Sequence, residues 1–512
     1  MSDYVVVGAG STGCVIARRL AESGARVTLI EAGGSDRSLR FVAPAMYPLI
    51  QDSDADWCFR TAPQRELDDR IIPWPRGKVL GGSSSINAMI WIRGHRSNYD
   101  AWADAGCDGW SWADVEPLFE RVESRVGVEP LERPLPACTA FVEACAHALD
   151  LPAGHDFNGS TQKGSGLFMR SCRDTRRDSA STAYLRDPVE GLSVLSNALA
   201  RRVVVENGRA VGVEVSRGST LETIRADREV IVCAGAIGSP HVLMLSGIGP
   251  ADHLREHGVE VVADVPGVGD NLQDHVFTPA SWRCTDPRAV MQLGPFTVIS
   301  RVLQWTFGRR SALATNHAEA GAFFHTRPGA APDMQFHFGP WGASPAHPDG
   351  RRADPPKGPH FSISATLLYP RSRGSIRLAS ARAEDAPTID AGYFTEPDDL
   401  DVMVRGLEAA REVVRASPLR ELAGEPANAG AGATTRDETI AGIRATSMTM
   451  FHPVGTCRMG VDAGSVVTPQ LSVRGVEGLR VADASIMPTI IGGNTNAACM
   501  MIGERLASFI AS

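Results

Sequence analysis

The sequence predicts an α/β fold: a Rossmann-like domain around a parallel sheet, joined to a second α+β domain that is built on an antiparallel sheet. Three observations predict it. The chain opens strand–turn–helix–strand over residues 4–31, which is the order of a βαβ unit. Two later apolar strands, Glu229–Cys233 and Leu479–Ala482, each lead into a helix. Residues 278–446 carry alternating, aromatic-rich runs that are typical of antiparallel strands.

The length of the chain predicts two domains, because 512 residues exceed the roughly 250–300 at which one core usually stops growing. We expect the first and last strands to share one sheet. The first domain is then discontinuous, with residues 1–277 joined by 447–512. The second domain covers 278–446, with contributions from about 150–190.

The opening elements follow from local pattern. Tyr4–Val7 is a short apolar run, as expected of a strand buried on both faces. Cys14–Ser23 has helical apolar spacing and stops at Gly24. Arg26–Ile30 is predicted as the second strand and ends at Glu31.

The middle of the chain has a different residue pattern from the opening elements. Met334–Phe338 and Phe361–Leu368 alternate like strands, and Ser372–Leu378 reads as a turn and a strand. Glu396–Arg415 is a long helical stretch, and a last helix is expected around Met500–Ile510. We interpret the middle as an antiparallel sheet with covering helices, which forms the substrate-binding half.

Bulk composition excludes several functions. A net charge of −8 without a basic face argues against a nucleic-acid partner. No signal peptide is recognisable, and no run approaches about 18 uninterrupted apolar residues, so no membrane span is expected. The ten cysteines form no CxxC pair. We interpret them as reduced thiols of a cytoplasmic protein and predict no metal site.

A glycine motif predicts a dinucleotide site. Gly8, Gly10 and Gly13 fit GxGxxG between a strand and a helix. Gly8 would permit the tight turn, Gly10 the approach of a pyrophosphate, and Gly13 close helix–strand packing. Glu31, at the end of the second strand, can accept ribose hydroxyls. Its negative charge would repel a 2′-phosphate, which disfavours NADP. A plain tight turn is the alternative, and the motif leaves FAD and NAD both open.

The Gly/Ser-rich loop, Gly77–Asn87, offers a second signal. Paired glycines and small hydroxylic residues let backbone lie against a flat ring and offer N–H and O–H donors. A surface loop is the alternative. The apolar flanks Val79–Leu80 and Met89–Ile92 favour a buried loop instead.

Four further segments complete a pattern: Gly235–Gly249, Gly269–His275, His452–Gly460, and a C-terminal block from Asp483 to Glu504 that contains Asn494-Thr495-Asn496. Together with the Gly/Ser-rich loop they resemble the glucose–methanol–choline (GMC) family of FAD-dependent alcohol oxidases and dehydrogenases. The resemblance runs from Tyr4 to the C-terminal helix.

The resemblance implies FAD as cofactor and a Rossmann-like FAD-binding domain. It places two residues at the substrate, His452 and Asn496, and makes His275 structural rather than catalytic. The cofactor-binding residues that it implies, together with those of the glycine motif, are Gly8, Gly10, Ser11, Thr12, Gly13, Glu31, Ala32, Val79, Gly82, Asn87, Ala88, Met89, Ile90, Val203, Ala234, Asp483, Ala484 and Thr495.

The chemistry of these side chains suits alcohol oxidation. Imidazole has an unperturbed pKa of about 6.5, so a neutral His452 can accept the hydroxyl proton. Asn496 can donate an N–H to the same oxygen while hydride passes from carbon to flavin N5, giving an aldehyde or ketone. The expected partners are a small alcohol and O₂ or another electron acceptor. The alternatives are a core histidine for His452 and a helix N-cap for Asn496.

One departure from the family bears on the cofactor. Some members tether FAD through a histidine just before the asparagine of the Gly/Ser-rich loop. Ile86 stands there, and an alkyl side chain cannot form that bond. We therefore expect non-covalent FAD.

Substrate choice stays open in the sequence. Glu319 is similar in placement to a glutamate of choline-oxidising relatives, although a surface or backbone-bonding carboxylate is the alternative. Phe451, Phe323, Phe324 and Trp341 could form an aromatic pocket or belong to the core. A second function class is an FAD-containing hydroxynitrile lyase that uses the same histidine.

Overall fold

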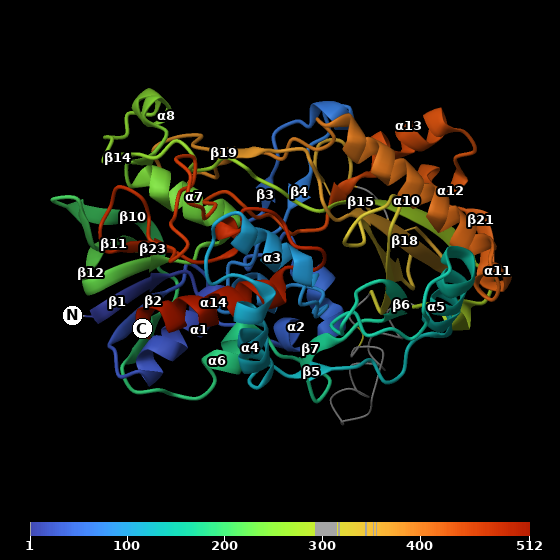
Figure 1. The fold of residues 1–512 in the computed structure, drawn as a ribbon, viewed down its shortest axis with the longest axis horizontal. Helices are drawn as coiled ribbons and strands as arrows, with labels where there is room; N and C mark the ends of the chain where they lie inside the picture. The colour runs from blue at the N-terminus through green and yellow to red at the C-terminus, as the bar shows by residue number, and fades with distance from the viewer. Residues whose placement is uncertain are drawn as a thin grey trace.

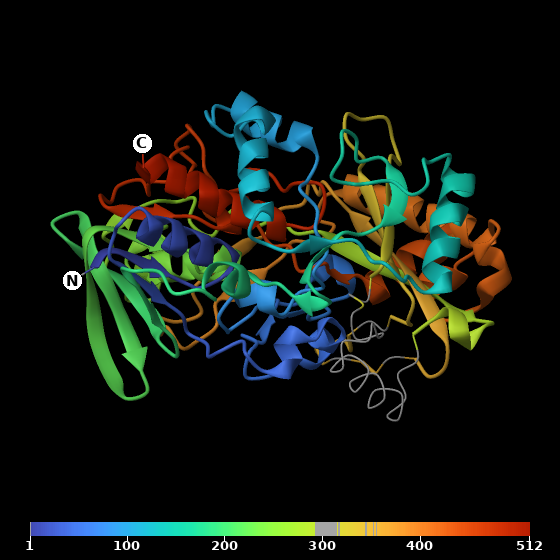
Figure 2. The same ribbon diagram turned by 90° about the horizontal axis from the view of Figure 1, so that it is seen from below.

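The structure, a computed structural model, describes residues 2–291, 315, 318–343, 346–351, 353–354 and 356–511. Two large sheets dominate it and lie towards opposite ends of the molecule (Figures 1 and 2). The predicted α/β class is confirmed, since one sheet is mainly parallel and the other antiparallel.

The first sheet contains the parallel strands. β1 (Ser2–Val7) pairs with β2 (Val27–Ile30) and with β12 (Thr220–Val232). β2 pairs with β9 (Leu192–Leu195), and β12 pairs with β23 (Leu479–Val481). The first and last strands of the chain therefore share one sheet, as expected.

Two helices from opposite ends of the sequence pack together beside this sheet (Figure 1). They are α1 (Ser11–Glu22) and α14 (Asn496–Ala511). Thr12 Oγ1 donates to the Cys499 carbonyl at 2.7 Å, which fixes the start of one helix against the other. α7 (Gly235–Leu245) follows β12, as predicted.

The first half of β12 belongs to an antiparallel extension. β10 (Leu199–Glu206), β11 (Arg209–Arg217) and β12 form a meander at the edge of the parallel sheet. β12 is thus shared by the two parts, and its last residues run parallel to β1.

The second sheet is antiparallel throughout and has the order β21–β15–β18–β17–β16–β6, with β22 also pairing with β15. Its strands are β6 (Gly164–Leu167), β15 (Val276–Cys284), β16 (Ala320–Phe324), β17 (Met334–Gly339), β18 (His360–Leu367), β21 (Ala423–Pro426) and β22 (Met448–Thr449). β6 lies within the 150–190 stretch that was expected to contribute here.

One face of the second sheet is covered by helices. Phe338 stacks on Phe141 of α5 (Pro136–Leu149), with ring centroids 4.6 Å apart. α10 (Pro397–Arg415) packs against β18 and β15. Since side chains alternate along a strand, the neighbours of Phe338 face the other way. That opposite face is left for the site.

Smaller elements connect these layers. The other α-helices of the described residues are α2 (Leu39–Val42), α3 (Arg96–Asp104), α4 (Trp112–Glu123), α6 (Ala180–Tyr184), α8 (Ala251–Glu256), α11 (Leu419–Leu422), α12 (Ala429–Gly432) and α13 (Arg436–Thr446). The short strands are β3 (Phe59–Arg60), β4 (Pro73–Trp74), β5 (Val128–Glu129), β7 (Arg170–Arg173), β8 (Arg176–Arg177), β13 (Ile248–Gly249), β14 (Ala263–Asp264), β19 (Ser375–Arg377) and β20 (Thr388–Asp390). None of the described helices combines the length and apolar character that a membrane crossing requires.

Candidate active site

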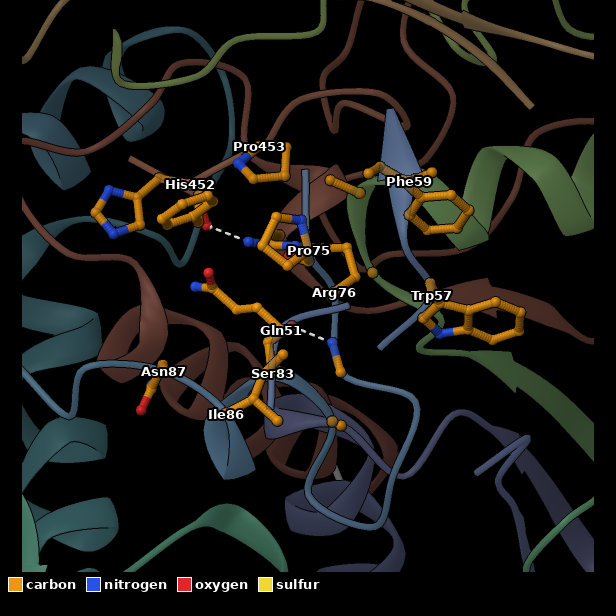
Figure 3. A pocket seen from close by; sticks show the side chains of 18 of the residues that line it. Gln51, Trp57, Phe59, Pro75, Arg76, Ser83, Ile86, Asn87, His452 and Pro453 are labelled. Carbon is orange, nitrogen blue, oxygen red and sulfur yellow. Dashed lines mark hydrogen bonds between the residues drawn. The ribbon is translucent and has the colours of Figure 1, made fainter. Parts of the chain in front are cut away.

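A cavity of about 600 Å³ is lined by residues of both large sheets. At one end lie the turn after β1 and the start of α1. At the other lie β15, β17 and β18 of the second sheet. Figure 3 shows His452 on one side of the cavity and Ile86 and Asn87 of the Gly/Ser-rich loop on the other.

The glycine turn has the shape that its motif predicts. Gly8 has φ +99°, and a Cβ on it would lie 2.5 Å from the Cys233 carbonyl oxygen. A Cβ on Gly13 would lie 1.9 Å from the Gly8 carbonyl oxygen, so close packing requires glycine there. Gly10 has open space instead, with Cys233 O its nearest neighbour at 4.0 Å. The start of α1 has no side-chain cap, which leaves its N–H groups for a ligand.

The Glu31 carboxylate holds the glycine turn through two backbone N–H groups. Its carboxylate accepts from the Ala9 N–H at 2.9 Å and from the Gly33 N–H at 2.8 Å. Burial raises the pKa of Glu31 to about 7. The side chain lines the cavity, and its contact with a ribose stays a prediction.

The Gly/Ser-rich loop is buried, so it is not a surface loop. Gly82 begins a 3₁₀ turn (Gly82–Ser85), and a Cβ on it would lie 2.8 Å from Gly10 Cα. Arg177 donates to Asn87 Oδ1 at 2.7 Å and to the Ser84 carbonyl at 3.1 Å. The loop therefore lies directly against the glycine turn, and a ligand in the cavity could contact both.

Most of the predicted cofactor residues line this cavity. Gly13, Val79 and Val203 do not: Gly13 packs inside the turn, and the Val203 N–H donates to Ser246 Oγ at 2.8 Å. Those that do are Gly8, Gly10, Ser11, Thr12, Glu31, Ala32, Gly82, Asn87, Ala88, Met89, Ile90, Ala234, Asp483, Ala484 and Thr495.

His452 follows β22 and is fixed at its backbone. Its N–H donates to Asp274 Oδ1 at 2.8 Å, and Tyr393 donates its hydroxyl to the other oxygen of Asp274. Phe451, just before it, has φ +66°, which turns the chain so that the imidazole enters the cavity. The His452 residue is 9 % exposed.

A chain of hydrogen bonds sets the tautomer of His452. His275 Nε2 lies 3.0 Å from the Leu368 carbonyl, which can only accept, so Nε2 carries the hydrogen. Burial lowers the pKa of His275 to about 3, so its Nδ1 is a bare acceptor. His452 Nδ1 lies 2.9 Å from that atom and must donate to it. His452 Nε2 is therefore left without a proton.

The basicity of His452 is also set by its surroundings. Burial and then the neighbouring His275 lower the pKa of His452 well below its ordinary 6.5. The ring is neutral at neutral pH and presents an unprotonated Nε2. This is the state that a proton acceptor needs before reaction.

Asn494, rather than the predicted Asn496, lies beside this nitrogen. Asn494 Nδ2 is 3.2 Å from His452 Nε2, while Gln335 Nε2 donates to Asn494 Oδ1 at 3.4 Å. Asn496 Oδ1 instead accepts from Ser11 Oγ at 2.7 Å, at the first residue of α14. The same three-residue run supplies both amides, and its first member faces the histidine.

His337 is a cavity residue that the sequence reasoning missed. It comes from β17, burial lowers its pKa to about 4, and its Nδ1 lies 3.2 Å from Thr366 Oγ1. Its buried Nε2 has no hydrogen bond of normal geometry among the described residues, although the nearby Asn494 side chain partly opposes the lowering of its pKa. The alternation of Met334–Phe338 was the available signal, since it places this histidine opposite Phe336 and Phe338.

Both carboxylate oxygens of Glu319 accept hydrogen bonds within the protein. One oxygen accepts from Thr315 Oγ1 at 2.5 Å and the other from the Leu135 N–H at 2.8 Å. It does not line the cavity, so the backbone-bonding alternative holds. Of the four aromatic candidates, Trp341 and Phe451 line the cavity, whereas Phe323 and Phe324 belong to the packed core.

A family model described as GMC oxidoreductase matches residues 2–277, and its C-terminal counterpart matches 370–503. An oxygen-dependent choline dehydrogenase from Brucella canis is 39% identical, over 99% of this chain and 95% of that protein. An alcohol dehydrogenase [acceptor] from Pseudomonas putida is 38% identical, over 100% of this chain and 96% of that protein.

Solved structures agree in fold. Pyridoxine 4-oxidase from Mesorbium loti is 30% identical with a TM-score of 0.88, covering 99% of both chains. Formate oxidase from Aspergillus oryzae has a TM-score of 0.90 at 24% identity, covering 99% of this chain and 98% of that one, and supports the fold alone.

Proposed function

The chain belongs to the GMC oxidoreductase family, and from this membership we propose that His452 deprotonates an alcohol and Asn494 holds it beside a non-covalently held FAD, which would be the oxidant. The expectation of an FAD-dependent oxidoreductase acting on alcohol groups is confirmed by the family match. The roles of individual residues and the mode of cofactor attachment are the proposal. The observation that carries it is the unprotonated His452 Nε2 beside Asn494 Nδ2.

The chain's residues fit the cofactor. The open space at Gly10 and the uncapped start of α1 suit a pyrophosphate, and the cavity continues from there to His452. A bound flavin would supply the acceptor for the hydride that leaves the alcohol carbon. The protein supplies position, a dry surrounding and the proton acceptor.

His452 takes the hydroxyl proton at Nε2. His275 holds the hydrogen on Nδ1, so only the cavity-facing nitrogen is available. Removal of this proton gives the substrate oxygen alkoxide character, which makes its carbon a better hydride donor. Asn494 can donate its amide N–H to the same oxygen and hold it next to His452.

Replacement of the base tests this assignment. His452→Ala should lower kcat at least ~10²-fold, the usual scale for general base catalysis, while flavin stays bound. His257→Ala is the matched control, because its ring lies outside the cavity and donates to the carbonyl of His253. A His452→Ala enzyme with near-normal turnover would refute the role.

The mode of attachment has its own test. Ile86 lines the cavity in the Gly/Ser-rich loop and offers only alkyl carbon, so no covalent tether forms there. Acid denaturation should release free flavin into the supernatant. Flavin that sediments with the protein would contradict non-covalent binding.

The electron acceptor and the rival lyase reaction are decided by one anaerobic experiment. Alcohols should bleach the flavin absorbance, and admission of air then shows whether O₂ restores it. Restoration supports an oxidase, and a persistently bleached flavin supports a dehydrogenase with another acceptor. Cyanide release from a cyanohydrin without any bleaching by alcohols would favour the lyase instead.

A further inference from the structure

We propose that Arg76 makes the part of the cavity beside His452 a binding site for negative charge, through the free edge of its guanidinium. This inference rests on the proposed function and adds an anion-binding residue to its site. Two sources can supply the charge. One is a carboxylate on the alcohol substrate. The other is the cofactor, because a hydride adds one negative charge to the flavin while the hydroxyl proton goes to His452.

Arg76 lines the cavity and is anchored there by two backbone carbonyls. Its Nε donates to the Pro75 carbonyl at 2.6 Å. Its Nη2 donates to the Phe451 carbonyl at 2.7 Å, and this bond is drawn in Figure 3. Since His452 follows Phe451 directly, the guanidinium is tied to the backbone that carries the catalytic imidazole.

The third guanidinium nitrogen of Arg76, Nη1, is left for a ligand. It has no hydrogen-bond partner among the described residues. It is also accessible, whereas the unpaired Nη2 of Arg70 is fully buried. A guanidinium edge with free N–H groups matches the oxygens of a carboxylate or of another delocalised anion.

The guanidinium of Arg76 bonds two carbonyls but no carboxylate of the described residues. Asp274 and Asp56 attract it through space. Asp274 is bonded to the His452 N–H and the Tyr393 hydroxyl, and Asp56 accepts backbone N–H groups, including that of Arg76. A charge that leaves water without a partner in contact costs free energy, so a ligand that brings the counter-charge is stabilised.

The carboxylates that line the cavity do not supply this counter-charge, because each has other partners. Ion pairs and hydrogen bonds within the protein account for them. Asp52 pairs with Arg60 and Glu384 with Arg201, while Glu31, Asp385 and Asp483 accept from N–H or hydroxyl donors.

The field of Arg76 reaches the catalytic corner. Burial lowers the pKa of Arg76, but a guanidinium stays charged in proteins. Burial and the neighbouring histidines lower the pKa of His452, and Arg76 adds to this effect. The start of α14, whose Asn496 and Cys499 line the cavity, adds the positive end of a 16-residue helix. Two positive sources therefore act on the space in which a negative charge would lie.

One pair of substrates and one pair of variants separate the two sources. 4-Hydroxybutanoate and 4-hydroxybutanamide are alike in size and differ in charge. Arg76→Gln removes the charge, and Arg76→Lys keeps it. Arg70→Gln is the matched control, because Arg70 is a buried arginine that donates to the Arg444 and Ser447 carbonyls at 3.0 Å outside the cavity.

If the substrate brings the anion, kcat/KM of the flavin-loaded enzyme should favour the acid over the amide at least about tenfold, the scale of a charge-assisted hydrogen bond. Arg76→Gln should lose this preference, and the reduction equilibrium of its bound flavin should be unchanged.

If the cofactor brings the charge, Arg76→Gln should lower kcat/KM for acid and amide alike. The equilibrium constant for flavin reduction should then fall at least about tenfold, which is about 30 mV in the midpoint potential of a two-electron couple. Equilibration with a redox dye measures this potential without turnover. It therefore stays informative even if no alcohol bleaches the flavin, a result that would contradict the proposed function instead.

Arg76→Lys should keep most of whichever effect applies, and Arg70→Gln should match the unmodified enzyme. The inference is overturned if Arg76→Gln alters neither the preference for the acid nor flavin reduction. It is also overturned if Arg76→Lys loses as much as Arg76→Gln, since the charge would then not matter. Flavin content and melting temperature restrict the comparison to folded, loaded enzyme.

Discussion

The glycine turn and the catalytic corner differ in how the sequence encodes them. The turn lies within residues 8–31 and is held largely by its own contacts, Gly13 against the Gly8 carbonyl and Glu31 against the Ala9 N–H, with Cys233, distant in the sequence, a neighbour of Gly8. The catalytic corner joins His275, His337, His452 and Asn494, which come from four separate segments. The shape of a contiguous motif is set mainly by residues close in the sequence. The geometry of the catalytic corner depends instead on which side chains of four distant segments the fold directs into the cavity.

The largest expected effect separates the two kinds of glycine within the turn. Gly13→Ala should prevent normal folding, because the added Cβ would lie 1.9 Å from the Gly8 carbonyl oxygen. Gly10→Ala should fold, since Gly10 has a negative φ of −81° and open space, but should bind FAD at least about tenfold more weakly.

Soluble yield, melting temperature and the flavin-to-protein ratio measure both variants. If Gly13→Ala and Gly10→Ala gave the same soluble yield, melting temperature and flavin-to-protein ratio, the distinction between a glycine needed for packing and a glycine needed for cofactor binding would be wrong.

The next effect compares the two asparagines. Asn494→Ala removes a donor beside His452 Nε2 and should lower kcat by about 10²-fold, the scale for loss of one such donor. Asn496→Ala removes the bond from Ser11 and should cost about 1 kcal/mol of stability, with kcat of the flavin-loaded enzyme within about threefold. Steady-state kinetics at matched flavin content decide between them, and the reverse order would restore the assignment made from sequence.

A smaller effect is expected at His275. His275→Phe keeps an aromatic ring but removes the acceptor for His452 Nδ1–H, so both tautomers of His452 become populated. We expect kcat to fall by about tenfold, while flavin content and KM change little. His275 is a positioning residue, so the pH profile of kcat/KM should change as well. An unaltered profile would show that the tautomer is set in another way.

The last expected effect concerns pH and stability. Burial lowers the pKa of His241 on α7 to about 4, so the unfolded chain binds a proton there that the native chain does not. The free energy of unfolding should therefore fall as pH drops from about 6.5 to about 4, by about 1.4 kcal/mol per pH unit for this histidine. Glu31 and Asp274, whose pKa values are raised by burial to about 7 and about 6, act in the opposite direction.

The difference between wild type and His241→Leu isolates the histidine from those carboxyls. Urea unfolding at several pH values should show a flatter dependence in the variant. Parallel curves would mean that His241 is not held neutral by the fold.

Much of the fold could be predicted because its signals are local. Tyr4–Val7, the alternation of Met334–Phe338 and the long helix that ends at Arg415 each appeared where a simple period placed them. Strand order could not be predicted in this way. The pairing of β6 with β16, for example, depends on a long-range contact between residues 164–167 and 320–323.

The site was predicted unevenly for the same reason. His452 stands alone in its motif, so its position was unambiguous. Asn494 and Asn496 are two residues apart, and a sequence does not show that the first faces His452 while the second bonds Ser11. Glu319 looked available because a sequence does not show that Leu135 and Thr315 already occupy its oxygens.

The bond between Ser11 Oγ and Asn496 Oδ1 joins residues that are 485 positions apart. On a ribosome, the glycine turn leaves the exit tunnel long before the helix that completes it has been translated. A nascent chain that has not yet reached Asn496 lacks one wall of the cavity. A chain that ends before Asn496 is therefore expected to lack part of the cavity lining and to retain flavin poorly.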